Sequence, residues 1–307
     1  MRPAYDPGER LLAVFLRGFL RVTFRPFIGP PLGARLQRTV VALLSPAMPG
    51  GTGTRQHTQQ MGGVPVRIVR PATGETTKGV ILYLHGGAFC LGSPRTHRSI
   101  TTRLAVAAGM TVMVPDYRLA PEHPYPAALD DAEACYRSLR NSGHRPEQIV
   151  LAGDSAGGSL ALALALRLRQ AGERPAALLL LSPVSDGSLS GETMTSMAGR
   201  DPMIRRGWLE QGLRWYGVPA GDLAHAPLSQ DLAGLPPMLI QVGELELLRA
   251  DATRLAAHAS ACGVACELEQ YPERWHVFHL QAFYLASARQ ALRRLGGYAR
   301  ARVDAAG

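Results

Sequence analysis

The chain has little of several features that would mark it for particular protein classes. It has only four cysteines among 307 residues, and none of them lies in a C-x-x-C pair or at a Cys/His spacing typical of zinc. We therefore expect free thiols in a reducing, cytoplasmic setting and no zinc site. The cysteines are Cys90, Cys135, Cys262 and Cys266.

The positive charge is plentiful but not concentrated. Net charge is +9 and the pI is about 9.9, yet aromatic residues make up only 6% of the chain and Lys78 is the only lysine. The arginines are scattered and do not form a basic stripe interleaved with aromatic residues. This pattern favours a solvated basic surface and predicts no nucleic-acid partner.

Long apolar runs are also lacking. No uncharged apolar run approaches the ~20 residues that span a bilayer, and Arg10 and Arg17 bracket the segment Leu11 to Leu16. We predict neither a signal peptide nor stable membrane insertion. Residues 9–48 do show a helical apolar period, which we interpret as a docked arm, with a helix lying on a membrane surface as the alternative.

From residue 55 onward, short apolar runs alternate with helical patterns. This order predicts an α/β fold with a mostly parallel sheet flanked by helices. The expected core spans 55–184 and 233–307, with residues 1–54 as an N-terminal cap arm and 185–232 as a cap insertion. The expected strands are 64–69, 80–84, 111–115, 149–152, 178–181, 238–242 and 266–271, and the expected helices are 128–140, 156–170, 204–216, 250–262 and 280–295.

The strongest local signal is Gly153-Asp154-Ser155-Ala156-Gly157-Gly158. It is a G-x-S-x-G motif between an apolar strand and a small-residue helix, which is the setting of a nucleophile elbow. Such a turn would expose the Ser155 hydroxyl at its tip. Asp154 is expected to support the neighbouring loops rather than to act as the catalytic acid.

Other reactive groups are expected at the carboxyl ends of neighbouring strands. His85-Gly86-Gly87 follows the strand 80–84, so the amides of Gly86 and Gly87, with that of Ala156, are candidate oxyanion donors. His85 is expected to brace this loop. A metal site is not predicted.

An acid and a base follow later, in the order Ser–acid–His that α/β-hydrolases use. Glu244, Glu246 and Asp251 compete as the acid after the strand 238–242. His276 and His279 compete as the general base.

Several ordered motifs together resemble the bacterial hormone-sensitive-lipase-like esterases of the α/β-hydrolase superfamily, in the branch with G-D-S-A-G. The resemblance covers roughly residues 80–280 and rests on these stretches: His85 to Phe89, Asp116 to Ala128, Gly153 to Gly158, Asp201 to Met203, Gly234 to Pro237, and His276 to Phe278. It implies an α/β-hydrolase fold with a two-part cap, no cofactor, and a triad of Ser155, Glu246 and His276. Many members carry Asp where Glu246 stands, so Asp251 and Glu244 remain alternatives.

The resemblance implies a serine carboxylesterase that forms an acyl-enzyme on short- to medium-chain esters. Lactone hydrolysis of the monoterpene ε-lactone type is the alternative, because it uses the same triad. A non-catalytic small-ligand-binding protein and an amidase or peptidase are weaker alternatives, and Ser155 argues against a dehalogenase or epoxide hydrolase. The expected partner is a small-molecule ester or lactone, and a homodimer is compatible with the resemblance.

Overall fold

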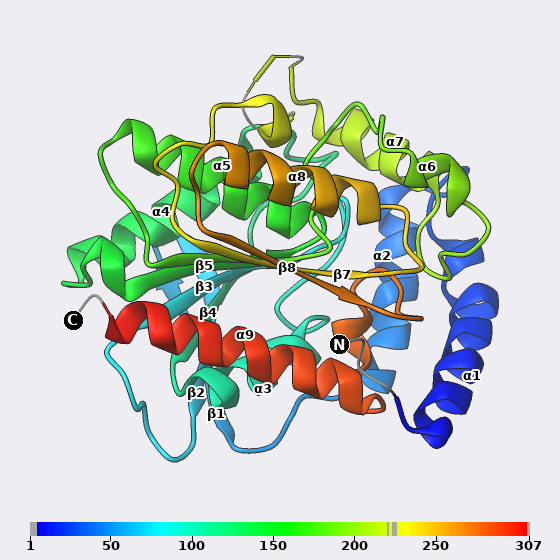
Figure 1. Cartoon of the computed structure of the whole chain (residues 1–307), viewed down its shortest axis with the longest axis horizontal. Helices are drawn as coiled ribbons and strands as arrows, with labels where there is room; N and C mark the ends of the chain where they lie inside the picture. Colours follow the sequence, from blue (N-terminus) through cyan, green and yellow to red (C-terminus); the bar gives the residue numbers. More distant parts are fainter. Residues whose placement is uncertain (1–4, 220, 223–225, 306–307) are drawn as a thin grey trace.

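The protein is built around a single eight-stranded sheet, seen nearly edge-on in Figure 1. This computed structural model describes residues 5–219, 221–222 and 226–305, so the remaining positions of the expected cap arm, insertion and core lie outside it. The strand order is β1-β2-β4-β3-β5-β6-β7-β8; β2 is antiparallel to β1 and β4, and the others are parallel. The strands are β1 (Thr54–Met61), β2 (Val64–Pro71), β3 (Val80–Leu84), β4 (Thr111–Pro115), β5 (Ile149–Asp154), β6 (Ala177–Leu181), β7 (Met238–Gly243) and β8 (Cys266–Tyr271).

Helices cover both faces of the sheet (Figure 1). One face carries α3 (Arg98–Ala108) and α9 (Ala286–Asp304), and the other carries α4 (Ala127–Asn141), α5 (Ala156–Gln170) and α8 (Arg249–Ala261). The mostly parallel sheet with helices on both faces confirms the predicted α/β architecture.

Strand composition explains why the sheet lies between two cores. Alternate side chains of a strand point to opposite faces, so a strand covered on both sides is apolar throughout. In β3, Ile81 and Tyr83 join the core under α3 and α9, while Leu82 and Leu84 join the core under α4, α5 and α8. Because β3 to β8 pair in parallel, their carboxyl ends lie at one rim of the sheet.

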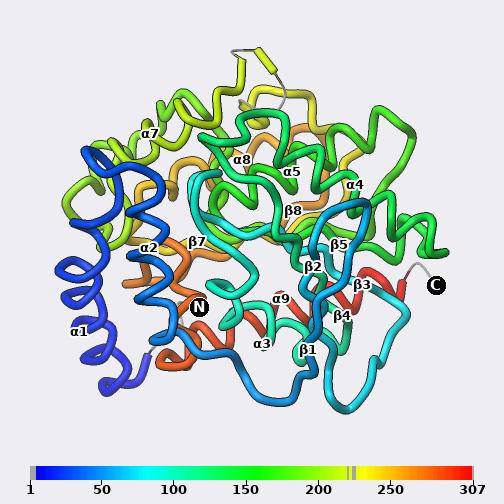
Figure 2. The backbone as a smooth tube through the Cα atoms, turned by 180° about the vertical axis from the view of Figure 1, so that it is seen from behind, coloured from blue at the N-terminus to red at the C-terminus, as the bar shows by residue number. Residues whose placement is uncertain are grey.

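Four helices gather beyond that rim, at the right of Figure 1 and the left of Figure 2. They are α1 (Pro7–Thr23), α2 (Ala34–Leu44), α6 (Thr193–Ser196) and α7 (Arg206–Tyr216). Hydrogen bonds join the N-terminal arm to α7 and the residue before it, although the two segments lie far apart in the sequence. Gln37 Nε2 donates to Gln211 Oε1 at 2.9 Å, and Arg205 donates to the Ile28 carbonyl at 2.6 Å. In the described part of the chain, no helix is both long and apolar enough to cross a membrane.

Candidate active site

Ser155 stands on a strained turn between β5 and α5. Its φ of 53° and ψ of −121° lie outside the common regions for a residue with a side chain. The turn needs glycine on both sides, because a Cβ at Gly153 would lie 2.3 Å from the Gly157 carbonyl oxygen, and one at Gly157 would lie 2.0 Å from the Leu84 carbonyl oxygen. The strand–turn–helix setting predicted from the motif is present.

His276 lies against this serine. Its Nε2 is 3.0 Å from Ser155 Oγ, so the hydroxyl donates to the ring in the tautomer that carries its proton on Nδ1. Burial alone would lower the pKa of His276, but the Glu246 carboxylate, together with the charges of Asp201 and Asp154, outweighs burial and holds that pKa above its usual value. The pair has the geometry of a nucleophile and its general base.

Glu246 lies on the other side of the imidazole. Its Oε2 is 3.7 Å from His276 Nδ1, an ion-pair distance that can tighten as charge develops on the ring. The same oxygen accepts a 2.9 Å hydrogen bond from Ser182, and Ser182 Oγ in turn accepts from the Val277 amide at 3.2 Å. Ser182 therefore ties the carboxylate to the histidine loop.

The rival residues have other partners. Asp251 Oδ2 accepts from the Ser185 and Asp186 amides at 3.0 and 3.1 Å, and Glu244 accepts from the Glu273 amide at 3.1 Å. His279 Nε2 is 3.0 Å from Gln241 Oε1, and burial lowers its pKa to about 3. The structure thus brings Ser155, Glu246 and His276 together and directs the three alternatives elsewhere.

In the loop after β3, one of the expected oxyanion donors is not free. The Gly86 amide donates to Asp154 Oδ1 at 3.0 Å, so it is not free to face an oxyanion as we had expected. In the described chain, the amides of Gly87, Ala88 and Ala156 have no hydrogen-bond acceptor. The free donors of this loop are therefore one residue further along than the sequence suggested.

Asp154 holds that loop in place. It accepts from Tyr83 at 2.6 Å as well as from Gly86, and its Oδ2 is 3.2 Å from His97 Nε2. His85 stacks between Tyr117 and His97, and burial, helped by the charge of His97, lowers its pKa to about 3. Both Asp154 and His85 thus have the supporting places that the sequence predicted.

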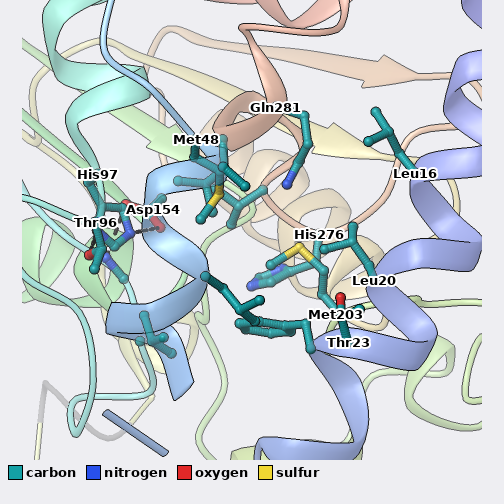
Figure 3. A pocket seen from close by; sticks show the side chains of 18 of the residues that line it. Leu16, Leu20, Thr23, Met48, Thr96, His97, Asp154, Met203, His276 and Gln281 are labelled. Atoms are coloured by element: carbon teal, nitrogen blue, oxygen red, sulfur yellow. Dashed lines mark hydrogen bonds and ion pairs between the residues drawn. The ribbon is translucent and has the colours of Figure 1, made fainter. Parts of the chain in front are cut away.

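A cavity of about 260 Å³ opens onto the serine. Gly86, Gly87, Ser155 and His276 line it, and the rest of its wall is mainly apolar. Figure 3 shows Leu16 and Leu20 of α1 on one side, Thr96, His97 and Asp154 on the opposite side, and His276 and Met203 between them. The wall thus combines the N-terminal arm, residues near α7 and the core.

Comparison with known proteins agrees with this geometry. A family model described as alpha/beta hydrolase fold matches residues 81–280. An esterase of the bacterial hormone-sensitive lipase (HSL) family, known from a crystal structure, is 36% identical with a TM-score of 0.89, covering 98% of this chain and 100% of that one. The chain belongs to this HSL family.

Curated relatives of this HSL-family chain carry names of the same kind. An acetyl-hydrolase of Streptomyces hygroscopicus is 40% identical over 236 residues, 76% of this chain and 78% of the relative. An esterase of Acinetobacter venetianus is 35% identical over 289 residues, 93% and 95% of the two chains. With the serine–histidine pair, these likenesses make the protein a serine carboxylesterase.

Two supporting residues of this HSL-family site were not assigned from the sequence. Asp201 Oδ2 accepts from the Leu247 amide at 3.2 Å, directly after Glu246, and burial raises the pKa of Asp201 to about 6. Ser182 is the other. Ser182 directly follows β6, at the same rim as Ser155, and this place at a strand end could have identified it as a residue of the site.

Proposed function

We propose that this enzyme hydrolyses carboxylic esters with short- to medium-chain acyl groups, using Ser155, His276 and Glu246. The observation that carries the proposal is the 3.0 Å separation of His276 Nε2 and Ser155 Oγ on the wall of the cavity. A serine hydroxyl is a weak nucleophile unless a base removes its proton during attack. The second nitrogen of the same ring faces Glu246 Oε2, which orients and stabilises the ring once it is charged.

The reaction follows from these contacts. Ser155 Oγ forms a bond to the ester carbonyl carbon while its proton passes to His276 Nε2. The tetrahedral intermediate collapses as the C–O bond to the alcohol breaks and His276 returns the proton to the leaving oxygen. Water then attacks the acyl-enzyme with His276 again as the base, which releases the acid and restores the serine.

The oxyanion of the intermediate needs donors beside the nucleophile. Gly87 and Ala156 stay in the proposed set, and Ala88 replaces Gly86 because Asp154 binds the Gly86 amide. Each such donor typically contributes about 10²–10³ in rate. The Asp154 contacts support the assignment because they fix the loop that carries two of the three amides.

The size of the cavity favours a small acyl group. At about 260 Å³ it is below the roughly 300–1,000 Å³ of pockets that hold drug-sized ligands. We expect initial rates on p-nitrophenyl esters to peak between acetate and octanoate and to be low on palmitate. A maximum on palmitate would contradict the proposed chain length.

The same assay distinguishes ester hydrolysis from the alternative, lactone hydrolysis. The names of relatives, acetyl-hydrolase and esterase, favour ester hydrolysis. A seven-membered lactone assayed beside p-nitrophenyl butyrate should turn over more slowly. Turnover of the lactone alone would overturn the proposed substrate class, and activity on neither would favour a ligand-binding role.

The pKa of His276 sets a direction for pH dependence. The base acts only when its ring is neutral, and its pKa lies above the ordinary value of about 6.5. We therefore expect kcat/KM to fall about tenfold per pH unit on an acid limb whose midpoint lies above pH ~6.5. Removing the charge in Glu246→Gln should move that midpoint to lower pH, and an unmoved midpoint would contradict the assigned partner.

A further inference from the structure

Exposed apolar side chains are concentrated at one end of the molecule. Eleven large apolar side chains are exposed in the described part of the chain, and eight of them belong to α1, α2 and the turn between these helices. Two more, Phe283 and Tyr284, lie in the segment before α9. The eight are Leu11, Val14, Phe15, Phe19, Val22, Phe27, Leu36 and Leu43.

Helix α1 is apolar on two faces. Ala13, Leu16 and Leu20 are buried toward the protein. The opposite stripe, written here as the outer stripe of α1, faces solvent; Leu11 is 73% exposed and Val22 is 72% exposed. The outer stripe consists of Leu11, Val14, Phe15, Gly18, Phe19 and Val22, which share a face at helical spacing.

The outer stripe continues into the cavity. Phe15, Phe19 and Tyr284 are exposed and also line the cavity that reaches Ser155. Figures 1 and 2 both show α1 as an outer helix at this end of the molecule. A molecule seated on the stripe would therefore lie at the mouth of the site.

The charge that the N-terminal arm itself carries along the stripe is mainly positive. Between Glu9 and Glu75 the sequence has no acidic residue, while residues 10–38 contain six arginines. Arg10, Arg17 and Arg21 share one flank of α1, beside Val14, at spacings of seven and four. The six are Arg10, Arg17, Arg21, Arg25, Arg35 and Arg38.

Most of this charge is not matched by a carboxylate through a hydrogen bond. Arg17 donates to the Glu273 carbonyl, Arg21 to the Gly199 and Arg200 carbonyls, and Arg25 to the Ala198 carbonyl. Arg38 differs, since it pairs with Glu122. Residues 6–38 thus have six arginines against the two carboxylates Asp6 and Glu9, which leaves a net positive charge along the apolar stripe.

From this arrangement we propose that the outer stripe of α1 docks the enzyme on an anionic lipid surface. Exposed apolar residues would enter the headgroup boundary while the flanking arginines contact anionic headgroups, as on interfacial amphipathic helices. A second copy of the chain fits less well, because a two-fold contact through this face would bring like-charged arginine rows together. The inference goes beyond ester hydrolysis, and binding requires no turnover.

The test is flotation of the full chain with lipid vesicles. Wild type should float with vesicles of phosphatidylglycerol and phosphatidylcholine and bind those of phosphatidylcholine alone much more weakly; added salt should weaken binding. The triple variant Leu11→Gln/Val14→Gln/Val22→Gln changes exposed residues outside the cavity wall. Its vesicle partitioning should fall at least about tenfold.

Matched controls make the result decisive. Val106 on α3 is 49% exposed and far from α1 in sequence, so Val106→Gln should leave flotation unchanged. All three proteins should hydrolyse dispersed p-nitrophenyl acetate alike, which shows that they are folded. The proposal would be overturned if the triple variant floated as well as wild type, or if wild type did not float. If wild type did not float but formed a dimer that the triple variant could not form, the outer stripe would be assigned to self-association. Flotation without hydrolysis would instead count against the proposed function alone.

Discussion

Replacing Ser155 by alanine is expected to lower kcat on p-nitrophenyl butyrate by about 10⁴–10⁶-fold. The change removes the oxygen that forms the acyl-enzyme, and neither His276 nor the free amides of the oxyanion loop can replace it. Alanine keeps the Cβ and the backbone bonds of the turn, including the 2.9 Å bond from the residue 155 amide to the Leu181 carbonyl. The measurement is steady-state hydrolysis, with thermal unfolding to show that the fold is intact.

Ser159 provides the matched control for this variant. It is a buried serine one turn further along α5, and its amide donates to the Ser155 carbonyl. Ser159→Ala keeps that amide and should leave kcat within a few-fold of wild type. If Ser155→Ala retained substantial turnover, the nucleophile would have to be another group.

Glu246→Gln is the second large effect, with an expected loss of about 10²–10⁴-fold in kcat. Glutamine is nearly isosteric, and its amide oxygen can still accept from Ser182. It carries no charge to stabilise the imidazolium and can orient the wrong tautomer of His276. The measurement is kcat and KM on the same ester, where the loss should fall on kcat.

The competing acids supply the controls for that result. Asp251→Asn leaves an oxygen to accept from the Ser185 and Asp186 amides, so its effect on kcat should be within about tenfold, with any cost of about 1–3 kcal/mol appearing in stability. Glu244→Gln should also be mild, because its partner is the Glu273 amide. A severe kcat defect in Asp251→Asn with an active Glu246→Gln would reverse the assignment.

The buried part of the fold was predictable because burial on two faces leaves a simple pattern. The strands β3, β4 and β8 and the helix α5 have the bounds expected from the sequence. The sequence indicates strand β1 only by a change of pattern near residue 55, because β1 is a polar edge strand with six exposed residues. Its position depends on pairing with β2. Its register follows from the two-residue turn Gly62-Gly63, where both φ angles are positive.

Two helices show where periodicity fails. Helix α3 was not predicted, since its sequence RSITTRLAVAA has polar and β-branched residues on a surface that is mostly buried. Helix α9 was expected at 280–295 but begins at Ala286 and ends at Asp304, after a short 3₁₀ turn at Phe278–Gln281. The arginines and alanines of its second half give little apolar period, although α9 packs against α3.

In the site, too, some residues could be predicted from local motifs, whereas others depend on contacts in three dimensions. Local motifs were enough to predict the elbow at Ser155, and the strand-end rule pointed to the loop of His276. The resemblance already favoured Glu246 over Asp251, and the three-dimensional partners of the two carboxylates support that preference. The loss of Gly86 as a free donor depends on the Tyr83, His97 and Gly86 contacts of Asp154, which no spacing in the sequence encodes.

The identity of the nucleophile is the central claim, and covalent labelling tests it most directly. Diethyl p-nitrophenyl phosphate should release one equivalent of p-nitrophenol per chain and abolish ester hydrolysis. Mass spectrometry of the digested protein should then place the diethylphosphoryl group on Ser155, and the Ser155→Ala protein should give no burst. Full inactivation with the label on another residue, or a burst retained in Ser155→Ala, would contradict the account.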